Sequence, residues 1–201
     1  IGLMYEKGLG IEHSIKLAKE NYEKIIQYGN NSLLVGKAQK NLADILWSES
    51  KGEDDKSPYI ELYEASFRNG VYSSITTLAK KFYDGDKIYK NLSRYFHYLT
   101  MGAEKNDSEA QWLLGRLFSY TYKVKENLIA SYYWYLRSVE NGNVDAMYWL
   151  AMEYLSDNKY LKSKMTKEVR RKKARSLLRK AAELGNYAAI NFIGDEDYSD
   201  W

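Results

Sequence analysis

The sequence predicts an all-α protein, a right-handed solenoid of about five helical hairpins. The first observation is a recurring slot of Leu or Ile followed by Gly or Ala, with a small residue four positions before it. The second is a glycine that closes each repeat, seven residues after an aromatic residue or Leu. The third is the connections, which are polar and vary in length. A lone hairpin cannot bury its apolar face, so the repeats are expected to stack into a single domain over residues 1–201.

The first helix of each repeat carries the Leu-Gly slot. The slots are Ile1-Gly2, Leu42-Ala43, Leu78-Ala79, Leu114-Gly115, Leu150-Ala151 and Ile193-Gly194. In a helix, a spacing of four places Ala110, Leu114 and Phe118 on one side. Gly115 lies next to that row, at a place where only a thin residue is expected to fit. Close approach of neighbouring helices at the small residues would leave the bulky residues to fill the space between layers.

The second helix of each repeat ends at the closing glycine. The bulky residue and its glycine are Tyr22 and Gly29, Tyr63 and Gly70, Tyr95 and Gly102, Tyr135 and Gly142, and Leu178 and Gly185. Apolar residues recur every three to four positions before each glycine, which is typical of an amphipathic helix. We expect each glycine to adopt the left-handed conformation that ends a helix. The repeats are then about 1–30, 33–70, 72–102, 107–142 and 145–185, with a terminal helix from 187.

Two connections inside the repeats are long and polar. Residues 48–57 are predicted to form a loop, and Pro58 after it suits the start of a helix, where its missing N–H costs least. Residues from 156 to about 168 are predicted to form the longest insertion, because the last interval between slots is the longest one.

Composition excludes several function classes. The 201 residues are 45% hydrophobic and include 20 tyrosines, which suit half-buried positions between helical layers. There is no cysteine, hence no disulfide or thiol chemistry, and no apolar run long enough to cross a membrane. A net charge of +3 does not by itself indicate a nucleic-acid partner. The sequence begins at Ile1, inside the first repeat and without a signal-like segment, so any targeting segment would lie outside it.

Together the motifs resemble the Sel1-like repeat family, a relative of the tetratricopeptide repeat. Repeat one matches the family pattern at Ile1, Gly2, Tyr5, Gly8, Gly10, Ile11, Ala18, Tyr22, Lys24, Gly29 and Asn30. Repeat five matches it at Ala146, Leu150, Ala151, Tyr154, Ala174, Lys180, Ala181, Ala182, Gly185 and Asn186. Repeats two and three depart from it, with Leu46 for the aromatic residue and Arg94-Tyr95 for Trp-Tyr. The resemblance implies an α-solenoid, mostly bacterial, that binds other proteins as an adaptor or scaffold and has no catalytic residues.

Residues suited to metal or acid–base chemistry are sparse. His13 and His97 are distant in sequence and no cysteine accompanies them, so we expect no metal site and no cofactor. The acidic clusters at 53–55, 84–86 and 195–197 lack the ligand spacing of a calcium loop. A short solenoid offers a groove rather than an enclosed pocket, so the protein is predicted not to be an enzyme.

A binding surface is predicted on one face of the first helices. Positions two, six and nine after the small residue share a face that the stacking slots do not use. They are Lys40, Asp44, Trp47, Thr76, Lys80, Tyr83, Trp112, Arg116, Ser119, Tyr148, Met152 and Leu155. In solenoids of this type the first helices line the concave side, so the face would look into a groove. The predicted anchors are Trp112, Tyr148 and Tyr83, and the predicted charged rim residues are Lys80, Arg116 and Asp44, in keeping with hot-spot chemistry. The alternative is that Trp112, Tyr148 and Leu155 simply pack against the neighbouring helix.

A basic run over residues 159–180 is the second candidate surface. Arg171, Arg175 and Arg179 lie at four-residue steps and would form a stripe on one helix face. Three interpretations remain open: a solvated helix face, a surface for an acidic protein partner, or a surface for nucleic acid or an anionic membrane.

Two functional hypotheses follow. The first is a non-enzymatic scaffold that holds a protein partner in its concave groove. The alternative is a bacterial immunity protein that neutralises a toxin or secreted effector by blocking its surface. Either would act in the bacterial cytoplasm or periplasm on another protein, without a cofactor.

Overall fold

The computed structural model describes residues 1–50, 58–84, 90–120, 127–156 and 158–195. All regular secondary structure within these ranges is α-helical, which confirms the predicted fold class. The chain divides into two compact units, Ile1–Gly102 and Ala103–Trp201, called here the N-terminal and C-terminal units.

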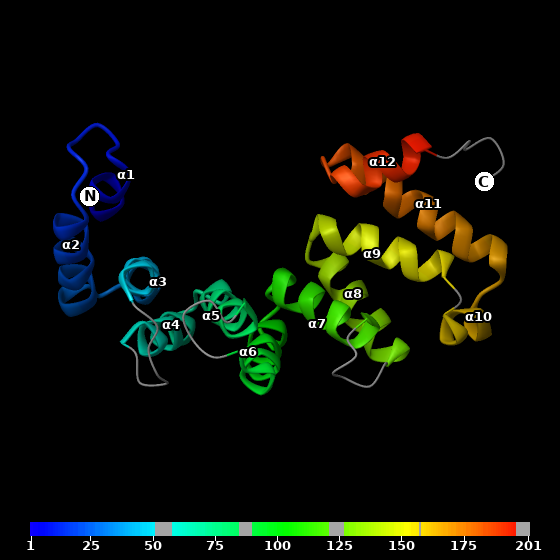
Figure 1. Ribbon diagram of the computed structural model, residues 1–201, viewed down its shortest axis with the longest axis horizontal. Coiled ribbons are helices and arrows are strands. Elements are labelled where there is room, and N and C mark those ends of the chain that lie inside the picture. The colour runs from blue at the N-terminus through cyan, green and yellow to red at the C-terminus, as the bar shows by residue number, and fades with distance from the viewer. Residues whose placement is uncertain (51–57, 85–89, 121–126, 157, 196–201) are drawn as a thin grey trace. The chain divides into compact units, whose positions relative to one another are not determined.

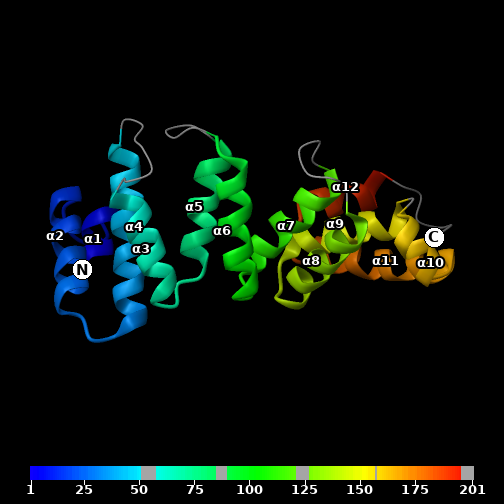
Figure 2. The same cartoon turned by 90° about the horizontal axis from the view of Figure 1, so that it is seen from below.

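The N-terminal unit consists of three hairpins (Figure 1). Their helices are α1 (Gly2–Lys7) with α2 (Ile15–Tyr28), α3 (Ser32–Glu49) with α4 (Pro58–Arg68), and α5 (Ser73–Asp84) with α6 (Leu92–Glu104). Figure 2 shows α5 and α6 side by side, where the rings of Phe82 and Tyr98 stack with centroids 5.6 Å apart. Since α2 also packs on α3 and α4 on α5, successive hairpins stack as the repeat predicts.

The C-terminal unit continues the pattern. Its helices are α7 (Ser108–Tyr120), α8 (Leu128–Glu140), α9 (Val144–Leu155), α10 (Lys159–Lys164), α11 (Lys167–Glu183) and α12 (Tyr187–Asp195). The hairpins are α7 with α8 and α9 with α11, while α8 packs on α9 and α11 on α12 (Figure 1). The short helix α10 lies between the two helices of the second hairpin in sequence.

The four central stacking slots lie in the cores of the two units, whereas Ile1 of the first slot is 78% exposed and Gly194 of the last is exposed. The slot residues Leu42, Leu78, Leu114 and Leu150 are each no more than 5% exposed. Burying such a side chain contributes about 1.5–3 kcal/mol of hydrophobic stabilisation. At Gly115 an added Cβ would lie 2.5 Å from the Tyr135 ring of α8, and at Gly2 it would lie 2.7 Å from the Tyr22 ring of α2. The prediction that only a thin residue fits at Gly115 is therefore confirmed.

Polar side chains join the two helices of a hairpin in the same way in both units. Between α3 and α4, Ser66 Oγ donates to the Gly36 carbonyl at 2.7 Å, and Asn69 Nδ2 donates to Gln39 Oε1 at 2.8 Å. The corresponding pairs between α7 and α8 are Ser138 with the Ser108 carbonyl at 2.6 Å and Asn141 with Gln111 Oε1 at 2.9 Å. These buried or half-buried groups satisfy one another, which fixes the register of each hairpin.

The glycine prediction is right for three of the five repeats. Gly70, Gly142 and Gly185 have φ values of 90°, 82° and 86° and end their helices in the left-handed conformation. The prediction is wrong for Gly29, which is extended at φ −72°. It is also wrong for Gly102, because α6 continues to Glu104 and the left-handed residue is Asn106, with φ 62°. Asn tolerates this conformation better than most residues, so the helix could lengthen without a glycine.

The two long connections differ from each other. Helix α4 begins at Pro58, as predicted, but residues 51–57 of the predicted loop lie outside the described residues. The insertion predicted from 156 to about 168 separates α9 from α11, and it contains the short helix α10, which the sequence analysis did not predict. Asn158 caps this helix by accepting from the Leu161 backbone N–H, and Leu161 itself is fully buried. A buried apolar anchor and a cap make a short helix stable in a segment whose composition reads as a loop.

Candidate protein-binding surface

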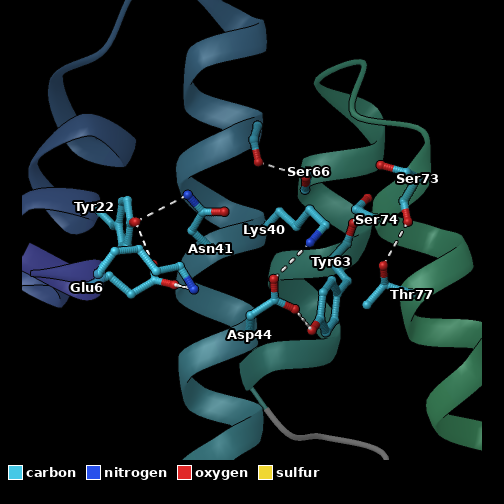
Figure 3. Close-up of polar contacts among 12 residues, drawn as sticks. Glu6, Tyr22, Lys40, Asn41, Asp44, Tyr63, Ser66, Ser73, Ser74 and Thr77 are labelled. Carbon is cyan, nitrogen blue, oxygen red and sulfur yellow. Dashed lines mark hydrogen bonds and ion pairs between the residues drawn. The ribbon is translucent and has the colours of Figure 1, made fainter. Parts of the chain in front are cut away.

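Asp44, on α3, is held by two donors from the N-terminal unit (Figure 3). Lys40 Nζ donates to Oδ2 at 2.8 Å, and the Tyr63 hydroxyl of α4 donates to Oδ1. Burial raises the pKa of Tyr63 far above its ordinary value, and the hydrogen bond to Asp44 raises it further, because an ionised phenol would face a carboxylate. The Asp44 side chain remains 40% exposed, so it satisfies a buried hydroxyl and is still accessible from solvent.

Trp47, one turn further along α3, lies in an aromatic and cationic cluster that the sequence did not predict. Its ring meets the Tyr59 ring edge-on, with centroids 5.2 Å apart. Lys81 Nζ on α5 lies 4.2 Å from the Trp47 centroid and 5.6 Å from the Tyr63 centroid, within cation–π range. Tyr59 and Lys81 were missed because they come from two other helices, and no spacing within α3 indicates them.

The candidates on α5 have different environments. Tyr83 is 40% exposed, stands 4.8 Å from the Tyr95 ring and carries Lys90 Nζ 4.1 Å above its own ring. Lys80 is half-buried. The assignment of Thr76 to the same binding surface is wrong, because its side chain is fully buried. Of the three candidates on α5, only Lys80 and Tyr83 are therefore accessible to solvent.

In the C-terminal unit, the structure brings three candidate side chains together. Arg116 on α7 is exposed, and its guanidinium carbon lies 5.1 Å from the Trp112 centroid on the same helix. It also lies 5.9 Å from the centroid of Trp149 on α9, and the Trp149 ring meets Tyr148 edge-on at 5.6 Å. This exposed cation and the aromatic rings beneath it are called the α7/α9 face. Trp149 was not among the predicted candidates, since it is one position away from the predicted face.

Four of the candidates on α7 and α9 also contribute to the core. Trp112, Tyr148, Met152 and Leu155 are all partly buried and pack against the core cluster of the C-terminal unit. The packing alternative therefore describes their contacts correctly. Hot-spot side chains are commonly well packed on their own protein, so packing and partner binding are compatible at Trp112 and Tyr148.

Ser119, also on the predicted face, belongs to a buried polar network. Glu153 on α9 is 3% exposed, and its Oε1 accepts from Ser119 at 2.7 Å and from Ser131 at 3.2 Å. Its Oε2 accepts from Asn158 Nδ2 at 2.7 Å. Three neutral donors from α7, α8 and the segment before α10 thus solvate this carboxylate. The network fastens the insertion to the unit, and sequence spacing gives no sign of it.

The basic run divides into a structural part and an exposed part. Arg170 is 8% exposed. Its Nη1 donates to the Tyr154 carbonyl at 2.8 Å and to the Ser156 carbonyl at 3.3 Å, both at the C-terminal end of α9. Of the predicted stripe, Arg171 and Arg179 are exposed and Arg175 is half-buried. The sequence did not distinguish Arg170 from its neighbours, because the carbonyls it meets belong to another helix.

Neither histidine is part of a cluster of ligand-type side chains. His13 is exposed, and His97 packs beside Tyr98 with ring centroids 5.3 Å apart. Over the described ranges, no group of three or more His, Cys, Asp or Glu side chains is placed to hold a metal ion. The acidic cluster at 53–55 and most of those at 84–86 and 195–197 lie outside these ranges. No helix in the described part of the chain is long and apolar enough to cross a membrane.

Stacked hairpins with small-residue contacts define a helical repeat protein, and comparison with known families agrees. The model of the Sel1 repeat matches residues 1–29, 108–143 and 144–186, which is more than half of the chain. The chain therefore belongs to the Sel1 repeat family. The stretch between the first two matches contains repeats two and three, whose motifs depart from the family pattern.

Solved structures show the same fold. A Sel1 repeat protein from Oxalobacter formigenes is 22% identical, with a TM-score of 0.71 over 91% of this chain and 70% of that one. A protective antigen of uropathogenic Escherichia coli with an SLR fold is 25% identical, with a TM-score of 0.70 over 94% of this chain and 38% of that one. An immunity protein from Pseudomonas aeruginosa is 18% identical, with a TM-score of 0.54 over 90% of this chain and 66% of that one. No curated protein matches the sequence.

Proposed function

We propose that the protein is a non-catalytic binding module and that the α7/α9 face is a contact site for a protein partner. Sel1 repeat proteins commonly mediate protein binding, and they are generally scaffolds rather than catalysts. The observation that carries the proposal is Arg116, an exposed guanidinium held above Trp112 and Trp149. Arg and Trp are the residues that most often dominate binding energy at protein interfaces.

The position of Arg116 in the repeat supports this assignment. Two residues after the Leu slot, successive repeats carry Leu3, Asp44, Lys80, Arg116 and Met152. The slot itself is always Leu or Ile. Stacking therefore does not require a particular residue at the Arg116 position, which leaves it available for specific recognition. In the N-terminal unit, Asp44 and Lys80 occupy the position of Arg116, and Trp47 and Tyr83 occupy that of Ser119. We propose that these four residues contribute partner contacts of their own.

The proposal is tested by capture from an extract of the native host with three baits, read by mass spectrometry. The baits are the wild-type chain, the Arg116→Glu variant and the Lys24→Glu variant. Lys24 is exposed on α2 and provides the same change of charge away from the α7/α9 face. We expect one set of proteins to bind the wild type and Lys24→Glu but to be depleted at least about tenfold with Arg116→Glu. Equal capture by all three baits, with circular dichroism unchanged, would rule out the α7/α9 face.

A second candidate function is that of an immunity protein, which binds a toxin or secreted effector and blocks it. The Pseudomonas aeruginosa structure, whose protein is described as an immunity protein, motivates this candidate. The test is co-expression with toxin-like proteins encoded beside this chain in its genome. Rescue of growth that depends on Arg116 would support the candidate, and failure to rescue from any of these neighbours would exclude it.

A further inference from the structure

Positive charge is concentrated in one part of the chain. Helices α10 and α11 contain eleven Lys or Arg residues and two Glu residues, a net charge of +9. The whole chain carries 30 basic and 27 acidic residues, so 19 basic and 25 acidic residues remain elsewhere, a net charge of −6. The modest overall charge of +3 therefore hides a strongly cationic helix pair in an otherwise acidic protein.

Several of these charges lie on the exposed sides of α11. The buried face of α11 is formed by Arg170, Ala174, Leu178 and Ala181. Arg170 binds the end of α9, and Lys173 Nζ lies 5.7 Å from the Tyr154 ring centroid. Lys167, Lys172, Arg179 and Lys180 are exposed on the other sides of the helix.

A hollow lies along the first three turns of α11. The described side chains that line it are Lys167, Glu168, Arg171, Lys172 and Arg175, and its volume is about 540 Å³. Arg175 Nε is enclosed, and no acceptor among the described residues lies within hydrogen-bond distance of it. An enclosed guanidinium N–H without an acceptor destabilises the folded state, so an acceptor supplied by a ligand would be favoured.

We propose that this cationic hollow binds an acidic segment of a partner protein. It lies on the second helix of its repeat and uses none of the α7/α9 residues, so it is a surface additional to the one proposed above. Arg175 supplies a planar fork that can hold a carboxylate through two parallel hydrogen bonds. Lys167 and Lys172 supply point charges for neighbouring carboxylates. An Asp- or Glu-rich segment matches both features.

Two observations favour an acidic protein segment over nucleic acid. Glu168 is one of the five lining residues, and it would repel a continuous row of phosphates. The net charge of −6 outside α10 and α11 would also oppose a long polyanion, whose field extends well beyond one helix. A short acidic segment can place its carboxylates beside the cations and leave Glu168 facing solvent.

The test is fluorescence anisotropy with a labelled peptide of ten glutamates at low salt, using the intact chain. We expect the wild type to bind, with an affinity that falls as salt is raised. The double variant Lys167→Glu with Lys172→Glu should bind at least about tenfold more weakly, since it reverses two of the four lining cations. The matched control is Lys24→Glu with Lys37→Glu, the same change of charge at exposed sites of the N-terminal unit, which should stay within about twofold of wild type.

A second variant, Arg175→Lys, keeps the charge but removes the fork, and we expect it to weaken binding by about three- to tenfold. Equal binding by the wild type and the Lys167→Glu, Lys172→Glu variant, both folded by circular dichroism, would overturn the proposal. The peptide is also competed with a short DNA duplex and with phosphatidylserine vesicles. Displacement by either at a lower charge concentration than by unlabelled polyglutamate would reassign the surface to nucleic acid or membrane and overturn the protein-segment proposal.

Discussion

Repeats two and three of the N-terminal unit and repeats four and five of the C-terminal unit use the same positions for opposite chemistry. A shift of 72 residues along the sequence relates repeat two to repeat four, and the first helix of repeat three to the first helix of repeat five. The structural residues correspond: Leu42 to Leu114, Tyr63 to Tyr135, Ser66 to Ser138 and Asn69 to Asn141. The polar contacts between helices that these Ser and Asn residues make are also the same.

Two charged positions are inverted between the two pairs. Asp44 corresponds to Arg116, and Lys81 corresponds to Glu153. Lys81 lies over the ring of Trp47, whereas Glu153 accepts from Ser119, the residue that corresponds to Trp47. Tyr59 likewise corresponds to Ser131, a second donor to Glu153. In the N-terminal unit the cation of Lys81 thus lies against aromatic rings. In the C-terminal unit the carboxylate of Glu153 accepts from hydroxyl and amide donors.

The repeat therefore specifies stacking but not the side chains around the charged positions. Each environment is consistent within itself, because the charge and its surroundings change together. A single exchange between the two environments should therefore cost far more than a change at a position that only the stacking uses.

Glu153→Lys is the most severe test. It places a lysine, the residue found at the corresponding position 81, among hydroxyl and amide donors that can bond only to an acceptor. We expect a loss of about 4 kcal/mol in the free energy of unfolding, measured with urea and circular dichroism, because a buried ammonium would lack a partner. Glu153→Gln retains one acceptor and should lose about 1–2 kcal/mol. A Glu153→Lys protein within about 1 kcal/mol of wild type would show that this position accepts either charge.

Gly115→Ala tests the stacking that both pairs share. The new Cβ would lie 2.5 Å from the Tyr135 ring, so α7 and α8 must separate or the ring must move. We expect a loss of about 1–3 kcal/mol from overpacking, despite the better helix propensity of Ala. Gly194→Ala on α12 is the matched control, because no atom lies within 4 Å of its added Cβ. Equal stability of the two variants would contradict the proposed close approach.

Tyr63→Phe tests the hydrogen bond of the N-terminal unit through its pH dependence. The pKa of Tyr63 is raised in the folded state by burial and by Asp44, so the neutral phenol stabilises the fold fully below the unfolded value of about 10. That stabilisation is lost as pH rises above this value, by up to about 1.4 kcal/mol per pH unit for each such tyrosine. We expect Tyr63→Phe to reduce this alkaline slope by about one proton equivalent, after a loss of roughly 1–2 kcal/mol at neutral pH. If Tyr63→Phe left the slope of the unfolding free energy between pH values of about 10 and 11 unchanged, the raised pKa would belong to another group.

Lys81→Met is expected to have the smallest effect. It removes the cation above Trp47 and keeps most of the apolar stem, so we expect a loss of about 0.5–1 kcal/mol. Lys37→Met, at an exposed position of α3, should change the free energy of unfolding by less than about 0.5 kcal/mol. A loss at Lys81 as large as that of Glu153→Lys would mean that the two charged positions are equally demanding.

The candidate surfaces were predictable only in part. Helical spacing correctly placed Arg116 on an accessible face, because that depends on one helix alone. It did not predict Trp149 or Lys81, since cation–π contacts join helices whose relative rotation no local pattern encodes. The same reasoning misplaced Thr76, whose side chain is buried, and could not tell the buried Arg170 from the exposed Arg171.

The hairpins, their order and the central stacking residues can all be predicted from the sequence. These follow from a spacing of four along a helix and from glycine at a close approach, and both are local properties. The polar pairs depend instead on how the helices pack: Tyr63 with Asp44, Glu153 with Ser119, Ser131 and Asn158, and Arg170 with the end of α9. Most of these partners come from different helices. A buried donor or acceptor must find its partner wherever packing brings one, and that pairing exists only once the helices are stacked.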